Sequence, residues 1–156
     1  MHPFAHIVWA SLWSGIASSA VDHARTFVRA TARKNPSAPP MSALRLAEAD
    51  NVLQTMRSGI EAVALEYRRM LEVQDREAFR SYGFAIRINN LKLAASRLVA
   101  DIVTDALAIC GVEAYRNDSP FSLGRQLRDA HSAALMIHND RIVQSNEALL
   151  LVHKGT

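Results

Sequence analysis

Apolar residues recur at alternating spacings of three and four along most of the chain, as in helices that bury one face. Three long runs of this kind cover residues 3–32, 42–72 and 76–109, and a fourth ends near residue 152. The second run follows strict heptads, which favours near-parallel packing of helices. No stretch alternates with a period of two. The pattern therefore predicts an all-α fold without strands.

Each run assigns a set of residues to the core. The expected stripe of the first helix is Ile7, Ala10, Ser14, Ala17, Val21, Ala24 and Val28. The expected stripe of the second is Leu46, Ala49, Leu53, Met56, Ile60, Val63, Tyr67 and Met70. In the third and the final helix it is Leu91, Ala94, Leu98, Ile102, Ala106 and Ile109, then Ile142, Val143, Leu149 and Leu150. Lys92 and Ser96 are expected to lie away from this core.

Proline, glycine and capping residues mark the breaks between helices. Three prolines within residues 34–41 exclude a helix and predict a stiff loop, after which Ser42 is the expected cap. Residues 74–75 form a tight connection. Gly83, after Tyr82, weakens helix propensity, so either a kink or a later helix start is expected there. Gly111 is expected to end the third helix.

The segment from Tyr115 to His131 is the longest one between the helical runs. Within it, Ser119 as the cap and Pro120 at the first helical position predict a short helix. Residues 132–138 have no clear period and are expected to be partly loop, and Asn139 or Asp140 is expected to cap the last helix. With short connections, the whole is predicted to be one domain, residues 1–156. Its architecture is an up-down four-helix bundle with a short extra helix before the last helix.

Charge and composition narrow the classes of partner. The 18 basic and 15 acidic residues are interleaved and give a net charge of +3, which does not indicate binding to nucleic acid. Residues 4–21 are apolar and end in a run that resembles a signal-peptidase site. However, no Lys or Arg precedes Arg25, and four serines dilute the segment below a convincing membrane span. We therefore expect a cytoplasmic protein that does not bind membranes.

Few residues in the sequence are candidates for catalysis or metal binding. The single cysteine, Cys110, excludes an internal disulfide and lies in an apolar helical run, which favours a core residue over a reactive thiol. His2 and His6 have a spacing that can chelate a metal on a helix, but no carboxylate lies near them, so no metal site is predicted. His131 and His138 flank residues 132–138, and either could act as a base near neutral pH.

Two motifs carry a resemblance to a known family. The run from Cys110-Gly111 to Phe121, followed by Arg128-Asp129-Ala130, resembles the C-terminal helical domain of the acyl-CoA dehydrogenase superfamily. The first two helices, with Arg33-Lys34 at the turn between them, are similar as well. The Ala- and Met-rich run that leads to Asn139 is closest to the branch that serves flavin-dependent monooxygenases.

The resemblance implies a role in binding FAD across a subunit boundary. Arg33, or Arg29 if the loop is aligned without a gap, would meet the pyrophosphate, where a charge-assisted contact makes physical sense. Residues from Gly111 to Tyr115 would approach the adenosine end. Residues 125–131, with Arg125 and Arg128, would contribute to the same shared site. The partners expected are further copies of the chain, as a homodimer or homotetramer.

The resemblance also shows what is missing. Relatives that oxidise acyl-CoA often carry a glutamate base seven residues after the alanine of Arg-Asp-Ala, and that position is Ile137 here. The monooxygenase-like relatives use a histidine in this loop, which makes His131 and His138 the candidates for catalysis.

No N-terminal helical domain or middle β-domain accompanies the bundle in these 156 residues. Two functions therefore stay open. The chain is part of a split FAD-dependent oxidoreductase that needs a separate chain with those domains and is inactive alone, or it is a non-catalytic oligomerisation or binding module.

Overall fold

A computed structural model of the chain describes residues 3–34, 36–38 and 40–154. Across these residues the structure is helical and contains no strand, which confirms the all-α prediction. The helices are, in chain order, α1 (Pro3–Lys34), α2 (Ser42–Glu72), α3 (Arg76–Arg80), α4 (Tyr82–Cys110), α5 (Val112–Tyr115), α6 (Gly124–Leu135) and α7 (Asn139–Val152).

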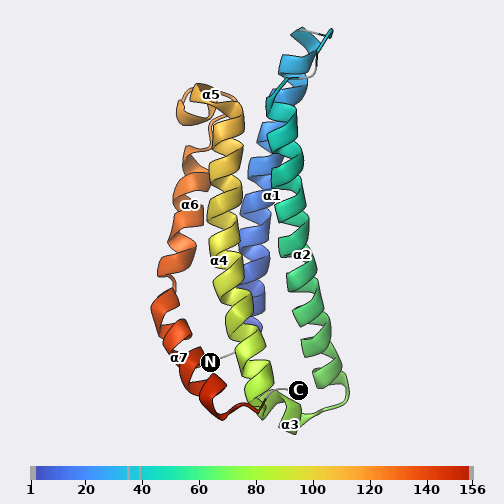
Figure 1. Ribbon diagram of the computed structural model, residues 1–156, viewed down its shortest axis with the longest axis vertical. Helices are drawn as coiled ribbons and strands as arrows, with labels where there is room; N and C mark the ends of the chain where they lie inside the picture. The colour runs from blue at the N-terminus through green and yellow to red at the C-terminus, as the bar shows by residue number, and fades with distance from the viewer. Residues whose placement is uncertain (1–2, 35, 39, 155–156) are drawn as a thin grey trace.

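The long helices run alternately up and down (Figure 1). α1 rises, α2 descends, α4 rises beside α1, and α6 with α7 descends to complete the bundle. The fourth position is thus filled by two shorter helices with a bend between them. α4 is the central element, because it packs against α1, α2, α6 and α7.

Two local features set the start and the end of α4 near the positions that the sequence suggested. Ser81 has an extended backbone, and its hydroxyl accepts a hydrogen bond from the amide of Phe84 at 3.2 Å. This N-cap separates α3 from α4, so the later start at Tyr82 is confirmed. At the other end Gly111 has a φ of 62°, which few residues with a side chain adopt, and its amide donates to the carbonyl of Leu107.

Several predicted helix starts are wrong. Ser42 is the first residue of α2 rather than its cap, and Met41 in the cap position makes no side-chain hydrogen bond. Ser119 and Pro120 lie in a turn, because the Ser119 hydroxyl bonds to the amide of Phe121 instead of starting a helix. α6 starts later, at Gly124.

The last two helices also differ from the prediction. Residues 132–138, expected to be partly loop, form the connection to α7 only at residues 136–138, because residues 132–135 continue α6. The backbone of His138 occupies the cap position of α7 without a side-chain hydrogen bond. Neither Asn139 nor Asp140 caps the helix, and Asn139 reaches back to α4 instead.

The predicted stripes of α1 and α2 form the main core together with α4, and most of their residues are buried or half-buried. The predicted burial is wrong at several positions of α4 and α7. Ala94, Val143 and Leu150 are exposed rather than buried. Lys92 and Ser96, expected outside, are 0% and 2% exposed because α6 and α7 cover them.

By length and composition, α1 could cross a membrane. In the bundle its small residues instead pack against neighbouring helices, with Ala17, Ala20 and Ala24 fully buried. Trp13 joins the core, and Trp9 is half-buried and stacks on the ring of His6. These contacts bury part of the apolar surface of α1, whereas Phe4, Val8 and Leu12 on the same helix are exposed.

Candidate cofactor-binding site

The residues expected to bind FAD gather mainly at one end of the bundle, where α1 and α4 end and α5 begins (Figure 1). Arg33 lies in the last turn of α1, and Arg29 lies one turn before it on the same face. Both side chains are exposed, and neither forms an ion pair within the described part of the chain. They are therefore free to bind a phosphate group.

α5 and the residue before it supply the second group of candidate FAD-binding residues. Gly111 and Tyr115 bracket the helix, and Tyr115 is 77% exposed, with its ring available for stacking. Ala114 anchors the segment, since it is fully buried and its carbonyl accepts from the amide of Leu123 at 2.9 Å. The structure thus presents an exposed aromatic ring on a firmly held short helix.

The turn after α5 is fixed by polar contacts of its own. Arg116 donates to both carboxylate oxygens of Asp118, at 3.0 and 2.8 Å. This contact lowers the pKa of Asp118 and raises that of Arg116. The Ser119 hydroxyl donates to the carboxylate of Glu113 at 2.9 Å. These bonds hold the turn against α5 without using Tyr115 or Gly111.

A groove between α1 and this turn was not anticipated from the sequence. It has a volume of about 370 Å³ and is lined by Asp22, His23, Thr26, Pro120 and Phe121. The ring of Phe121, which lines the groove, packs edge-on against that of Phe27, with 5.3 Å between centroids. Helical spacing could have placed residues 22 and 26 on the face of α1 that carries residues 29 and 33. It does not predict that the turn with Phe121 lies against this face.

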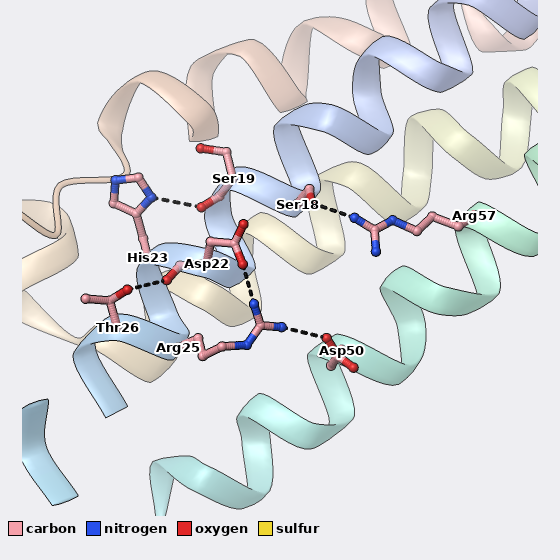
Figure 2. A network of polar contacts seen from close by, with 8 residues as sticks. All are labelled: Ser18, Ser19, Asp22, His23, Arg25, Thr26, Asp50 and Arg57. Carbon is pink, nitrogen blue, oxygen red and sulfur yellow. Dashed lines mark hydrogen bonds and ion pairs between the residues drawn. The ribbon is translucent and has the colours of Figure 1, made fainter. Parts of the chain in front are cut away.

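The side chains around this groove are ordered by a polar network (Figure 2). The imidazole Nδ1 of His23 bonds to the carbonyl of Ser19 at 2.8 Å, and the hydroxyl of Thr26 donates to the carbonyl of Asp22 at 2.9 Å. Arg25 bridges the carboxylate of Asp22 to that of Asp50 on α2. Asp22, which lines the groove, therefore shares one guanidinium group with Asp50.

A second contact in the same network joins α1 to α2. The Arg57 guanidinium donates to the hydroxyl of Ser18 at 2.6 Å, on the side of α1 that faces α2 (Figure 2). Arg25 and Arg57 thus both link α1 to α2. The buried stripe of α1 sets which face of the helix is exposed, and that exposed face carries Arg29 and Arg33.

Arg125 and Arg128 occupy a different place from the other predicted cofactor residues. Both lie on α6 and are 85% and 78% exposed, and both approach the carboxylate of Asp129, at 3.7 and 3.6 Å. Arg125 and Asp129 line a second groove of about 330 Å³ against Leu12 and Gly15 of α1. Because Asp129 shares its charge with both arginines, they are weaker candidates for holding a phosphate than Arg29 and Arg33.

The candidate catalytic histidines are not brought together. His131 is exposed on α6, and His138 is exposed at the corner between α6 and α7. Within the described residues neither side chain makes a hydrogen bond. Ile137, which stands where related dehydrogenases place a base, is 37% exposed on the same corner. The chain alone thus offers solvent-exposed bases rather than a closed active site.

Two other sequence predictions concern buried groups. Cys110 is 3% exposed, and burial raises the pKa of its thiol from 9.0 to about 11, as expected of a core residue. His6 is buried, and its Nδ1 bonds to the carbonyl of Ile88 at 3.3 Å. His2 lies outside the described residues. Within the described ranges no three His, Cys, Asp or Glu residues cluster as metal ligands.

Comparison with known proteins adds one match. The family model for the C-terminal domain of acyl-CoA dehydrogenase matches residues 7–141 of the chain. This range runs from the first turns of α1 to the start of α7 and includes every residue of the candidate site. No curated protein and no solved structure gives a significant match.

Proposed function

Because the chain belongs to the family of acyl-CoA dehydrogenase C-terminal domains, we propose that it is the bundle part of an FAD-dependent oxidoreductase. In this proposal the chain contributes to a shared FAD site and to oligomerisation. The observation that carries the proposal is the pair of exposed arginines, Arg29 and Arg33, at the same end of the bundle as Tyr115.

The residues at this end fit a dinucleotide. Two guanidinium groups one helical turn apart can bind a pyrophosphate, since planar donors pair well with phosphate oxygens. The exposed ring of Tyr115 offers a surface for an adenine to stack on, and Gly111 leaves open space where a Cβ would lie. When bound, the flavin would supply the electron acceptor or the oxygen chemistry.

The chain alone does not enclose a flavin ring. The grooves beside α1 are open to solvent, and a ring in either would keep one face in water. An exposed apolar row on α1, formed by Phe4, Val8 and Leu12, is a suitable seat for further domains. We therefore place the N-terminal helical and β-domains on another chain, or on another part of a longer protein.

The branch of the family that we propose rests on residues of α6 and of the α6–α7 corner. Ile137 cannot remove a proton, so dehydrogenation of an acyl-CoA has no base at that position. His131 on α6 and His138 at the corner remain as the candidate catalytic groups. This favours flavin-dependent oxygenation over α,β-dehydrogenation. The alternative function, a non-catalytic oligomerisation module, is favoured by the exposure of both histidines.

A binding experiment separates these two functions. FAD is titrated into the purified chain, alone and together with a chain that carries the two missing domains, and flavin fluorescence is followed. Tight binding that appears only in the mixture is the result expected for the bundle part of a flavoenzyme. Absence of binding under both conditions, with assembly of the chains intact, would leave only the non-catalytic module.

A further inference from the structure

A buried lysine sits behind the corner that carries Ile137 and His138. Lys92 of α4 is 0% exposed, although a lysine is rarely fully buried without a charged partner. No carboxylate pairs with it in the described part of the chain. Burial lowers the pKa of its amine, which shows that the position is unfavourable for a charge. Contacts of the amine must therefore offset the cost of its burial.

The amine of Lys92 makes three contacts in the bundle. Nζ donates to the backbone carbonyl of Ala133 at 3.2 Å and to Oδ1 of Asn139 at 2.6 Å. It also lies 5.6 Å from the centre of the Trp13 ring, within the range of a cation–π contact. An ammonium group has three N–H donors, and these three contacts can engage all of them.

The two oxygen acceptors belong to the two helices that meet at the corner. Ala133 is in the last turn of α6, where carbonyls have no partner within the helix and the helix dipole favours a cation. Asn139 is the first residue of α7, and its Nδ2 donates to the hydroxyl of Ser96 at 3.1 Å. Lys92 and Ser96 thus tie the end of α6 and the start of α7 to α4.

The corner between these two ends is strained. Ile137 has a φ of 55° and His138 a φ of 28°, so two consecutive residues with side chains have positive φ. For a β-branched residue such as isoleucine this conformation is rare and persists only where the surroundings enforce it. No glycine lies in the corner to relieve it.

We propose that Lys92 is a positioning residue, whose buried ammonium group holds residues 136–138 in their strained form and so fixes where Ile137 and His138 stand. The structural part of this proposal does not depend on flavin binding. Only its link to an active-site loop rests on the proposed function. Loss of the tether releases the corner while the rest of the bundle stays folded.

Amide hydrogen exchange tests this at named positions. The amides of Met136, His138 and Arg141 are bonded to carbonyls within or beside the corner, and they report on its opening. In Lys92→Met, which keeps an unbranched side chain one atom shorter and removes the donors, their exchange is expected to rise about tenfold to a hundredfold. The amides of α2, on the other side of α4, are expected to keep their wild-type rates.

A matched variant separates positioning from general damage. Val99→Ala removes buried apolar volume from the same helix, away from the amine, and is expected to raise exchange throughout the bundle. If Lys92→Met gives that general pattern, or leaves the corner protected, the proposal is wrong. If Lys92→Met does not fold, Asn139→Ala removes one acceptor at a half-buried position and must open the same three amides.

A second substitution tests the strain itself. Ile137→Gly places at this position a residue that adopts positive φ freely. Added to Lys92→Met, it is expected to restore at least part of the protection at Met136 and Arg141. An additional increase in exchange in the double variant would show that the corner is not held against strain, which would contradict the proposal.

Discussion

At the scale of single residues, the molecule is notable for polar groups that are buried without a charged partner. His6 and Lys92 lie inside the bundle, and each is held by backbone or amide oxygens. The Nε2 atom of His6 has no hydrogen-bond partner in the described residues. Burial first, and then the charge of Lys92, lower the pKa of His6, although the Ile88 carbonyl opposes this shift.

The lowered pKa of His6 predicts a pH dependence of stability. Between its pKa in the folded state and the ordinary value of 6.5, the unfolded chain binds more protons than the folded one. The free energy of unfolding therefore rises with pH across this interval and falls as the pH drops below 6.5. Urea unfolding of wild type and His6→Leu from pH 5 to 8 should show a flatter profile in the variant. His131→Gln, at an exposed position, controls for the loss of a histidine.

Cys110 gives a prediction about reactivity. With the pKa of its thiol raised from 9.0 to about 11, the thiolate fraction near neutral pH falls roughly a hundredfold. Alkylation by iodoacetamide at pH 8 should therefore be slower than in urea-unfolded chain by at least that factor, with burial slowing it further. Equal rates in the folded and unfolded chains would contradict the assignment of Cys110 to the core.

At the scale of elements, the helices could be predicted because their buried faces are continuous. The heptad stripe of α2 is buried or half-buried along its length, and α2 packs against α1 and α4. Near the end of α2, Tyr67 and Met70 belong to a second cluster with residues of α3 and α4. Helix starts were less predictable. Ser119 and Asn139 have the chemistry of caps, but their side chains bond to Glu113 and Lys92 instead, and such tertiary partners are not visible in local sequence.

The burial of Lys92 and Ser96 likewise could not be predicted from the local sequence. By helical spacing they lie beside the main stripe of α4, and their polar side chains suggest an outward face. They are buried because α6 and α7 cover this side of α4 and bring oxygen acceptors to it. For the candidate site, helical spacing could place Arg29 and Arg33 on one face near the end of α1, whereas the groove at His23 depends on the turn that carries Phe121.

The break after α4 predicts an effect on stability. Gly111 has a φ of 62° and a ψ of −140°, a region that is essentially restricted to glycine. Gly111→Ala should lower the free energy of unfolding by about 1–3 kcal/mol, measured by urea titration. The matched variant is Gly59→Ala in α2, where an added Cβ meets nothing within 4 Å. That change should raise stability by about 0.5–1 kcal/mol, because alanine favours a helix. Destabilisation by both variants would contradict this explanation.

At the scale of the whole molecule, the bundle is a family domain that exposes an apolar row and two arginines on α1. Phe4, Val8 and Leu12 form an apolar row on α1, and Arg29 and Arg33 continue the exposed side of the same helix toward the other end. If this side faces other domains or other copies, Leu12→Glu should weaken their association. Sedimentation of the chain with and without a chain that carries N-terminal helical and β-domains of this family measures this association. Unchanged association in Leu12→Glu would remove the row from the interface.

The central claim is that the arginines at the end of α1 hold the pyrophosphate of FAD. The direct measurement is FAD affinity, by fluorescence titration of the assembled complex, for wild type, Arg29→Gln, Arg33→Gln and the control Arg80→Gln. Arg80 is also exposed, but it ends α3 at the opposite end of the bundle. Loss of one charge-assisted contact is expected to weaken binding about tenfold to a hundredfold in Arg33→Gln or Arg29→Gln, while Arg80→Gln binds like wild type. Equal affinity in all four proteins would contradict the claim.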